Sequence, residues 1–157
     1  MVSLIVAIGR DNIIGKGNKL PWHYKEDMKY FKDTTMNKTV IMGEMTFKSI
    51  LSYVNKPLHN RTSIIATLTD YEYPGVEKTN DIVNFLKNYP KDKEIFIIGG
   101  KIIYDLTLDI ADRLYITHID KDFEGDVYFR EIDYSKYNKI SERKSNELNF
   151  SVYERIG

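Results

Sequence analysis

The sequence predicts an α/β fold: a mixed, mostly parallel sheet with helices on both faces and an antiparallel C-terminal strand. Short apolar runs alternate with helical patterns along most of the chain, as in proteins with buried parallel strands. Towards the C-terminus the pattern changes to a two-residue alternation, which is typical of a strand that covers one face. The 157 residues contain no internal repeat and no long linker, so we expect a single domain over residues 1–157.

The expected strands are short apolar runs bounded by polar or glycine-bearing segments. They cover Val2–Ile8, Thr39–Met42, Ser63–Ala66, Val76–Lys78, Ile95–Ile98 and Leu114–Ile119. A final antiparallel strand contains Phe150 and Val152 and is expected to pair with the Lys139–Arg143 region. The loop from Gly9 to Pro21 is too long for an ordinary connection, which favours a lid.

The expected helices keep apolar side chains on one face and begin at capping residues or glycine turns. They run from about Lys25 to Thr34, from Gly43 to Ile50, from the Thr79–Asp81 caps to Pro90, and from Gly100 to about Leu106. This alternation of strand and helix is what a sheet covered on both faces requires.

The composition excludes several functional classes. With 23 Lys plus Arg against 23 Asp plus Glu the formal net charge is zero, which argues against nucleic acid or another polyanion as a general partner. The absence of cysteine removes zinc fingers, iron–sulfur clusters and thiol nucleophiles. The three histidines, His23, His59 and His118, form no metal-binding pattern, so no metal site is expected.

The apolar run at the N-terminus is interpreted as a buried strand rather than a signal peptide or an anchor. Its seven residues, from Val2 to Ile8, are too few to span a bilayer, and no basic segment precedes them. We therefore expect a cytoplasmic protein without a membrane partner. No apolar surface stripe indicates an obligate oligomer, so a monomer is expected.

Two strand-to-helix turns are candidate phosphate sites. Gly43 precedes Glu44, Met45 and Thr46, and Gly99-Gly100 precedes Lys101, Ile102 and Ile103. The first turn of a helix presents unpaired N–H donors and a partial positive charge, so two such turns side by side could hold a pyrophosphate without a basic residue. For each turn taken alone, an ordinary tight connection between a strand and a helix is the preferred interpretation.

Asp27 is the most informative carboxylate. It shares a helix face with Tyr24, Met28 and Phe31. A carboxylate on an apolar stripe is poorly solvated, which raises its pKa and suits it to hold a cationic or amide-like ligand. The alternative from the residues alone is an acidic residue in a first helical turn, favoured there by the helix dipole.

Five segments occurring together in order resemble the dihydrofolate reductase family. They are LIVAIGRDNIIGKGNKLPW, Asp27 with Phe31, VIMGEMTF, IFIIGGKIIYD and LYITHIDKDFEGD, between Val2 and Phe129. The resemblance implies the eight-stranded dihydrofolate reductase fold. It also implies reduction of 7,8-dihydrofolate to tetrahydrofolate, with hydride moving from NADPH to C6 of the pterin and a proton reaching N5. Antifolate inhibitors are then expected ligands.

The resemblance also implies the substrate site. Asp27 matches the carboxylate that binds the 2-amino group and N3 of the pterin, and Thr117 the threonine that orients it. Because that carboxylate binds the side of the ring far from N5, the N5 proton is expected from a water positioned near Trp22 and Leu20. Arg61 matches the arginine that grips the glutamate α-carboxylate of the substrate. The apolar walls match Ile5, Ala7, Met28, Phe31, Ile50, Leu58 and Ile98.

The cofactor site follows from the same resemblance. Ile98 and Tyr104 match residues at the nicotinamide, Gly99-Gly100 matches a pair joined by a cis peptide, and Thr46 with the backbone of Met45 matches the pyrophosphate site. The loop from Gly9 to Trp22 matches a lid, and Glu124-Gly125-Asp126 the loop that stabilises its closed form. The expected cofactor residues are Ala7, Ile14, Gly15, Asn18, Leu20, Gly43, Glu44, Met45, Thr46, Thr67, Lys78, Ile98, Gly99, Gly100, Lys101, Ile102 and Tyr104.

Glu44 departs from the family pattern. The position after Gly43 is commonly a cation that pairs with the 2′-phosphate of NADPH, and a carboxylate there repels a phosphate and can accept a hydrogen bond from a free ribose 2′-OH. We therefore expect weakened discrimination and some use of NADH, with Lys48, Thr67 or Lys78 as compensating groups. A second departure, Arg130 after the EGDxxF run, has no assigned role.

Two other functions remain open on the sequence alone. One is a related pterin or pyrimidine reductase on the same scaffold, which would not need Asp27 and Arg61 together. The other is a noncatalytic nucleotide- or folate-binding module, in which the sites persist without turnover.

Overall fold

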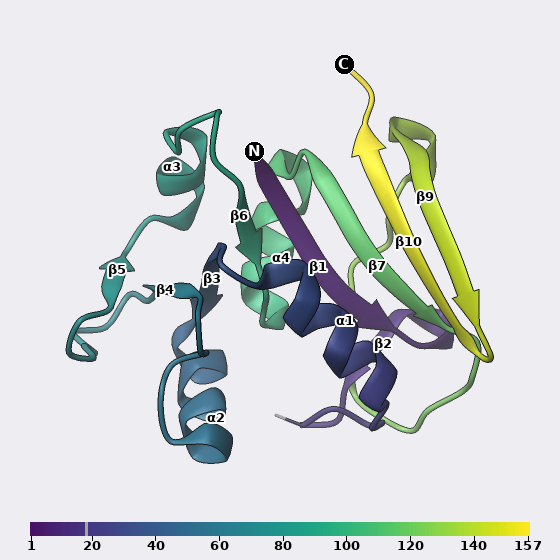
Figure 1. Ribbon diagram of the computed structural model, residues 1–157, viewed down its shortest axis with the longest axis horizontal. Helices are drawn as coiled ribbons and strands as arrows, with labels where there is room; N and C mark the ends of the chain where they lie inside the picture. Colours follow the sequence, from purple (N-terminus) through teal and green to yellow (C-terminus); the bar gives the residue numbers. More distant parts are fainter. Residues whose placement is uncertain (18) are drawn as a thin grey trace.

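The computed structural model describes residues 1–17 and 19–157, so Asn18, which was expected at the cofactor, lies outside the described residues. The main sheet consists of β1 (Val2–Ile8), β3 (Thr39–Gly43), β4 (Thr62–Ala66), β5 (Glu77–Thr79), β6 (Ile95–Ile97), β7 (Arg113–Ile119), β9 (Tyr137–Ser145) and β10 (Leu148–Arg155). Their order is β5-β4-β3-β6-β1-β7-β10-β9 (Figure 1). Strands from β5 to β7 pair in parallel, whereas β7, β10 and β9 pair antiparallel. The predicted class and the eight-stranded mixed sheet are confirmed.

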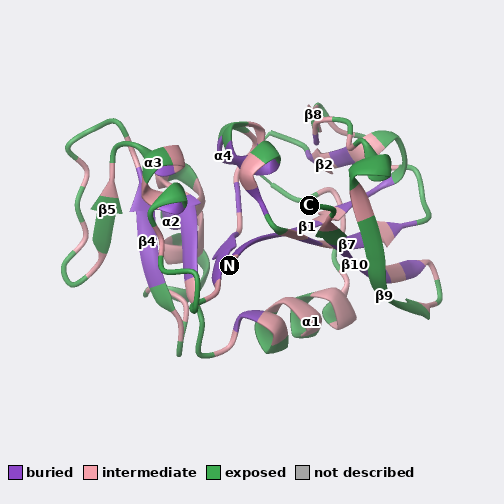
Figure 2. Cartoon of the chain, turned by 90° about the horizontal axis from the view of Figure 1, so that it is seen from above, coloured by how far each residue is buried: buried purple, intermediate pink, exposed green. Residues whose placement is uncertain are grey.

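Helices cover both faces of this sheet, as predicted. They are α1 (Lys25–Thr35), α2 (Glu44–Val54), α3 (Ile82–Lys87) and α4 (Lys101–Thr107), with short 3₁₀ turns η1 (Arg10–Asn12), η2 (Leu108–Ile110) and η3 (Tyr134–Lys136). Figure 2 shows α1 and α4 on opposite sides of the sheet. None of the helices in the described part of the chain is long and apolar enough to cross a membrane.

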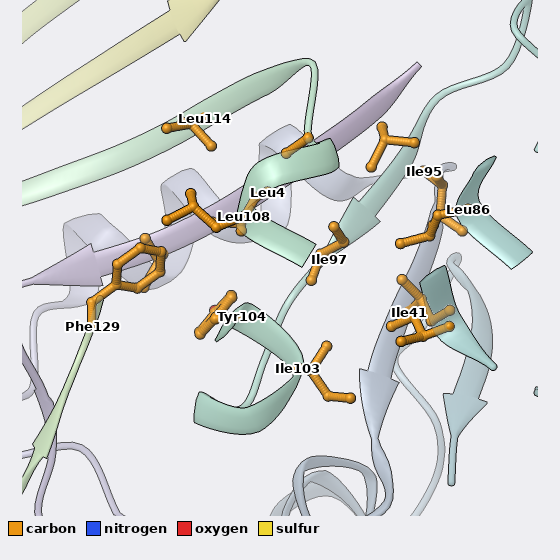
Figure 3. Close-up of a cluster of buried hydrophobic side chains, with 14 of the residues drawn as sticks. Leu4, Ile41, Leu86, Ile95, Ile97, Ile103, Tyr104, Leu108, Leu114 and Phe129 are labelled. Atoms are coloured by element: carbon orange, nitrogen blue, oxygen red, sulfur yellow. The ribbon is translucent and has the colours of Figure 1, made fainter. Parts of the chain in front are cut away.

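Each face of the sheet has its own core, because alternate side chains of a strand point to opposite faces. On one face, Leu4 and Ile97 pack with Ile103 and Tyr104 of α4 (Figure 3). On the other, Ile5 and its neighbours pack with Phe47 of α2, and α1 adds partly buried aromatic side chains. The carboxyl end of β1 thus presents one row of side chains to α1 and the other to α4.

The C-terminal strands form the antiparallel end of the sheet. Phe150 of β10 lies opposite Thr117 of β7 and opposite Arg143 of β9. The expected partner of β10 is therefore confirmed, although β9 extends beyond the predicted Lys139–Arg143 region at both ends. The register shifts between Val152 and Tyr153, where β9 carries an extra residue.

Two elements differ from the sequence prediction. The loop after β1 contains a strand, β2 (Ile13–Gly15), which pairs antiparallel with β8 (Val127–Tyr128). Helix α2 does not end at Ile50 but continues one turn to Val54. It stops at Asn55, which adopts the left-handed conformation at φ 62° and donates its N–H to the carbonyl oxygen of Leu51.

Candidate active site

The site lies where the carboxyl ends of the central parallel strands meet, with α1 crossing one side. Asp27 sits half-buried in the first turn of α1, and Thr117 is buried on β7. Burial raises the pKa of the Asp27 carboxyl, and a hydrogen bond with the Thr117 hydroxyl opposes that rise in part. No cation among the described residues contributes to this pKa, so the half-buried carboxylate has only a hydroxyl as its partner.

Most of the apolar residues expected around a substrate gather in one cluster beside this carboxylate. Ile5 is its buried member on β1, and the cluster also includes the partly buried Phe31, Ile50, Leu58 and Ile98. Ala7 and Trp22 pack against a neighbouring cluster with Phe150 at its centre. Met28 is the exception, because it is 56% exposed and belongs to none of the hydrophobic clusters.

Tyr104 reaches from α4 to the central strand β1. Its buried hydroxyl donates a 2.8 Å hydrogen bond to the backbone carbonyl of Ile5. Burial, with a smaller contribution from the Asp27 charge, raises the pKa of this hydroxyl far above its usual value. Tyr104 is therefore a neutral, fixed group that links α4 to β1.

Two glycine turns stand side by side next to Tyr104. The N–H of Gly43 donates to the carbonyl oxygen of Gly99 over 2.9 Å, and the Gly99-Gly100 peptide bond is cis, as the resemblance implied. A Cβ on Gly100 would lie 3.3 Å from the hydroxyl oxygen of Thr46. Gly43 caps α2 without a side-chain hydrogen bond, so the first turn of α2 keeps its free N–H groups.

Both rims of these turns carry exposed apolar side chains. Met45 on α2 is 67% exposed and Ile102 on α4 is 73% exposed. Lys101, at the start of α4, pairs with Asp105 one turn later over 3.1 Å. The backbone of the turns, rather than a free cation among the described residues, is thus the group that faces the cleft.

The loop from Gly9 to Trp22 is held against the loop that contains Glu124-Gly125-Asp126. Asp126 accepts a hydrogen bond from the N–H of Gly17 over 2.8 Å and donates its own N–H to the carbonyl oxygen of Gly15 over 3.1 Å. The rings of Trp22 and Phe123 lie 4.8 Å apart. The predicted pairing of these two segments is therefore present.

Within that loop the expected residues have different surroundings. Ile14 packs partly against the core and Gly15 is buried, whereas Leu20 is 64% exposed. The indole Nε1 of Trp22 is buried and has no hydrogen-bond partner among the described residues. A buried N–H donor of this kind requires a partner from a ligand or a bound water.

Arg61 is half-buried at the far end of the apolar cluster. Its Nε donates to the carbonyl oxygen of His59 over 2.8 Å, and one terminal nitrogen donates to the Thr35 hydroxyl over 3.2 Å. Burial lowers the pKa of the guanidinium, which nevertheless remains charged. The two bonds fix the plane of the guanidinium and leave its other terminal nitrogen available to a carboxylate.

Glu44 lies in a network that the sequence indicated only in part. Its carboxylate accepts 2.6 Å hydrogen bonds from the Lys48 ammonium and from the hydroxyls of Thr67 and Thr69. Among the compensating groups considered, Lys48 and Thr67 are therefore in contact with Glu44. Lys78 instead donates to the Tyr71 carbonyl and pairs with Glu72.

Sequence reasoning missed two hydroxyl residues, Thr69 at Glu44 and Thr35 at Arg61. A pair of threonines two residues apart at the end of β4 was the available signal for the first. Arg130, which had no assigned role, pairs with Asp109 and donates to the carbonyl oxygen of Asp105. Within residues 1–17 and 19–157, the structure groups no three His, Asp or Glu side chains that could hold a metal ion.

Comparisons with known proteins define the class of the molecule. A family profile described as dihydrofolate reductase matches residues 1–155. The dihydrofolate reductase of Buchnera aphidicola subsp. Acyrthosiphon pisum is 41% identical over 94% of this chain and 90% of its own length. The dihydrofolate reductase of Bacillus subtilis is 37% identical over 99% of this chain and 95% of its own.

A solved structure gives the same result. Dihydrofolate reductase from Enterococcus faecalis, complexed with NADP(H) and RAB-propyl, superposes with a TM-score of 0.85 at 32% identity, covering 100% of this chain and 97% of that one. The chain described here belongs to the dihydrofolate reductase family.

Proposed function

We propose that this chain reduces 7,8-dihydrofolate to tetrahydrofolate with NADPH, the activity of the family to which it belongs. The observation that carries the proposal is the half-buried Asp27 carboxylate, which has the Thr117 hydroxyl as its partner and lies on α1 with Phe31 of the apolar cluster around Ile5. A carboxylate in this setting is matched by a ring that offers an amino group and an adjacent N–H. The pterin of dihydrofolate has both, and its remaining faces are apolar enough for the surrounding cluster.

The rest of the substrate is assigned along the same cluster. Ile5, Phe31 and Ile98 pack against the pterin, with Ala7 beside it and Met28 at the rim. Ile50 and Leu58 hold the benzoyl group. Arg61 pairs with the glutamate α-carboxylate, because its guanidinium is pre-oriented by His59 and Thr35. The same pockets accommodate antifolate inhibitors.

The glycine turns fit NADPH, because the close approach of Gly100 to Thr46 leaves bare backbone where a pyrophosphate must approach. The first turn of α2, through Met45 and Thr46, then donates its free N–H groups to the pyrophosphate. Ala7, Ile98 and Tyr104 surround the nicotinamide. When bound, NADPH supplies the hydride that C6 of the pterin receives. The remaining assigned residues are Ile14, Gly15, Asn18, Leu20, Gly43, Glu44, Thr67, Lys78, Gly99, Lys101 and Ile102.

Proton delivery to N5 is assigned to a water held beside Trp22 and Leu20. Asp27 binds the opposite edge of the ring, at the 2-amino group and N3, and is therefore too far from N5 to act directly. The buried Nε1 of Trp22, which has no partner among the described residues, is a donor suited to fixing that water. Asp27 and Thr117 then hold the ring in place while the proton arrives.

The loop from Gly9 to Trp22 is assigned the role of lid. Its attachment to Asp126 through Gly15 and Gly17 supports a closed position over the cofactor side of the cleft. Closure excludes water from the reacting carbons and brings them together. The proposal also takes residues 1–157 as one domain, acting as a monomer in the cytoplasm, where NADPH is available.

Measuring the loss of the near-ultraviolet absorbance of NADPH in the presence of dihydrofolate tests the proposal. Purified protein is expected to consume NADPH only when dihydrofolate is present, and Asp27→Asn is expected to remove most of that rate. Turnover with a bicyclic pterin or a pyrimidine that lacks the benzoylglutamate tail, at an equal rate, would favour the related reductase instead. Binding without consumption of NADPH would favour a noncatalytic module.

A further inference from the structure

The adenosine half of the cofactor site is defined by the order of the strands. The glycine turns follow β3 and β6. Strand β1, which carries Ala7 of the residues assigned to the nicotinamide, lies on the other side of β6. A dinucleotide whose pyrophosphate rests on the turns must therefore place its adenosine on the side of β4 and β5. This step rests on the proposed function.

Glu44 lies at that end of the site because of the register between two strands. Strands β3 and β4 are neighbours in the sheet (Figure 1). Gly43 at the end of β3 is opposite Ala66 at the end of β4, so the next residues, Glu44 and Thr67, emerge side by side. Their side chains meet over 2.6 Å. The adenosine ribose, one phosphate away from the turns, is the part of the cofactor that comes closest to this pair.

The Glu44 carboxylate is charged and well held. Its side chain is 18% exposed, and its bonds to Lys48, Thr67 and Thr69 lower the pKa of the carboxyl to about 2. The ammonium of Lys48, at 2.6 Å from Glu44, also lies 4.6 Å above the ring of Tyr71. One cation and two hydroxyl donors are thus already occupied by a carboxylate of this chain.

We propose that Glu44 sets the cofactor specificity of the enzyme, by occupying the donors that a ribose 2′-phosphate would use. A dianionic phosphate entering this position meets a fixed negative charge and must displace Lys48 from it. A free ribose diol meets an acceptor for its 2′-OH and displaces no cation. The enzyme therefore uses NADH with an efficiency within about tenfold of that with NADPH, because one unit charge at contact distance changes binding by about that factor.

Isothermal titration with two nucleotides that lack nicotinamide tests this without turnover. Adenosine 2′,5′-bisphosphate carries the 2′-phosphate, and 5′-AMP does not. The wild-type protein is expected to bind the two with affinities within about tenfold of each other. Glu44→Gln should strengthen binding of the bisphosphate about tenfold and change that of 5′-AMP by less than about twofold.

Two further variants test whether Glu44 and Lys48 cause the change in affinity for the bisphosphate. Adding Lys48→Met to Glu44→Gln should reduce the gain, because the part of it that comes from the released ammonium is lost and only the relief of charge repulsion remains. Asp92→Asn, which removes the same charge from an exposed loop at the opposite end of β6, should leave both affinities unchanged. Circular dichroism establishes that each variant folds, and if Glu44→Gln does not fold, the wild-type ratio alone decides.

A wild-type protein that binds the bisphosphate more than about a hundredfold tighter than 5′-AMP would overturn the proposal. So would a ratio that Glu44→Gln leaves unchanged. The steady-state efficiencies with NADPH and NADH should follow the same ratio. Lack of turnover with both cofactors would contradict the proposed function, whereas the ratio of the two nucleotide affinities would still report on Glu44.

Discussion

Asp27→Asn is expected to make the protein more stable and less active. The side chain is half-buried beside Thr117, burial is the largest influence on its pKa, and no cation offsets it. An amide of nearly the same shape removes the charge and keeps a hydrogen bond to the Thr117 hydroxyl. We expect the free energy of unfolding near neutral pH to rise by about 1–2 kcal/mol, the penalty for one poorly solvated polar group.

The sign of the pH dependence follows from the direction of the pKa shift. In the folded chain the pKa of Asp27 is raised above its ordinary value of 3.8, so the folded state holds its proton more tightly than the unfolded chain. The contribution of Asp27 to stability is fully present below the unfolded pKa and is lost as pH rises through the folded pKa. Each tenfold difference in proton affinity corresponds to about 1.4 kcal/mol. Asp27→Asn should remove this part of the pH dependence.

The activity of Asp27→Asn should fall although its stability rises. The carboxylate is assigned two hydrogen bonds to the pterin, and a bond to a charged group exceeds a neutral one by about 1–1.5 kcal/mol. Losing that difference twice lowers kcat/KM near neutral pH by about 30- to 150-fold. Acid should restore part of the rate, because substrate protonated in solution needs no ionised partner.

Urea unfolding across the acid-to-neutral range, together with kcat/KM over the same range, measures both effects. A variant that is less stable than the wild type near neutral pH would refute the view of Asp27 as a poorly solvated carboxylate. A variant with undiminished neutral activity would refute its role at the pterin. Glu26→Gln is the matched control, because Glu26 is the preceding carboxylate of α1 and points to Arg143 and Ser145, away from the cleft.

Three other substitutions test separate parts of the structure. Arg61→Lys keeps the charge but loses the planar pair of donors, so the KM for dihydrofolate should rise at least about tenfold with kcat nearly constant; an unchanged KM would contradict the assignment. Tyr104→Phe leaves the carbonyl of Ile5 without its donor and should lower the free energy of unfolding by about 1–3 kcal/mol in urea titrations; equal stability would argue against that bond. In Gly125→Ala the new Cβ would lie 2.5 Å from the carbonyl oxygen of Gly15, so the two loops must separate. Because the lid then loses its support, kcat should fall in steady-state assays. An unaltered kcat would contradict the role of the lid in the mechanism.

The sequence predicted those parts of the fold that depend on local patterns. Continuous apolar runs located β1 and the other buried strands, and Asp81 caps α3 by accepting from the N–H of Asn84, as its position indicated. The β2–β8 pair could not be predicted, since each strand has at most three residues and Ile13 pairs with Tyr128, far along the chain. The sequence prediction ended α2 at Ile50, one turn too early, because Ser52 and Lys56 are polar residues of the kind common in loops.

The residues of the candidate site also divide into those that the sequence pattern indicated and those that it did not. Asp27 was a candidate because an acidic residue on an apolar helix stripe is unusual, and the glycine turns were candidates because they follow apolar strands. Their assignment to substrate and cofactor came from the resemblance to the family. Hydroxyl partners carry a weaker signal, because serine and threonine are common everywhere on a surface. Thr69 was marked only by its spacing from Thr67, and Thr35 had no signal at all. The sequence predicted that Glu44 would disfavour a ribose 2′-phosphate. The ion pair between Glu44 and Lys48 was found only in the structure.

Hydride transfer to dihydrofolate is the central claim, and isotope labelling measures it most directly. NADPH carrying deuterium at both C4 positions would be mixed with the enzyme and dihydrofolate, and the product examined by NMR spectroscopy. We predict tetrahydrofolate with one deuterium at C6 for each NADPH consumed, formed much more slowly by Asp27→Asn. Consumption of NADPH without tetrahydrofolate, or tetrahydrofolate without deuterium at C6, would contradict the account.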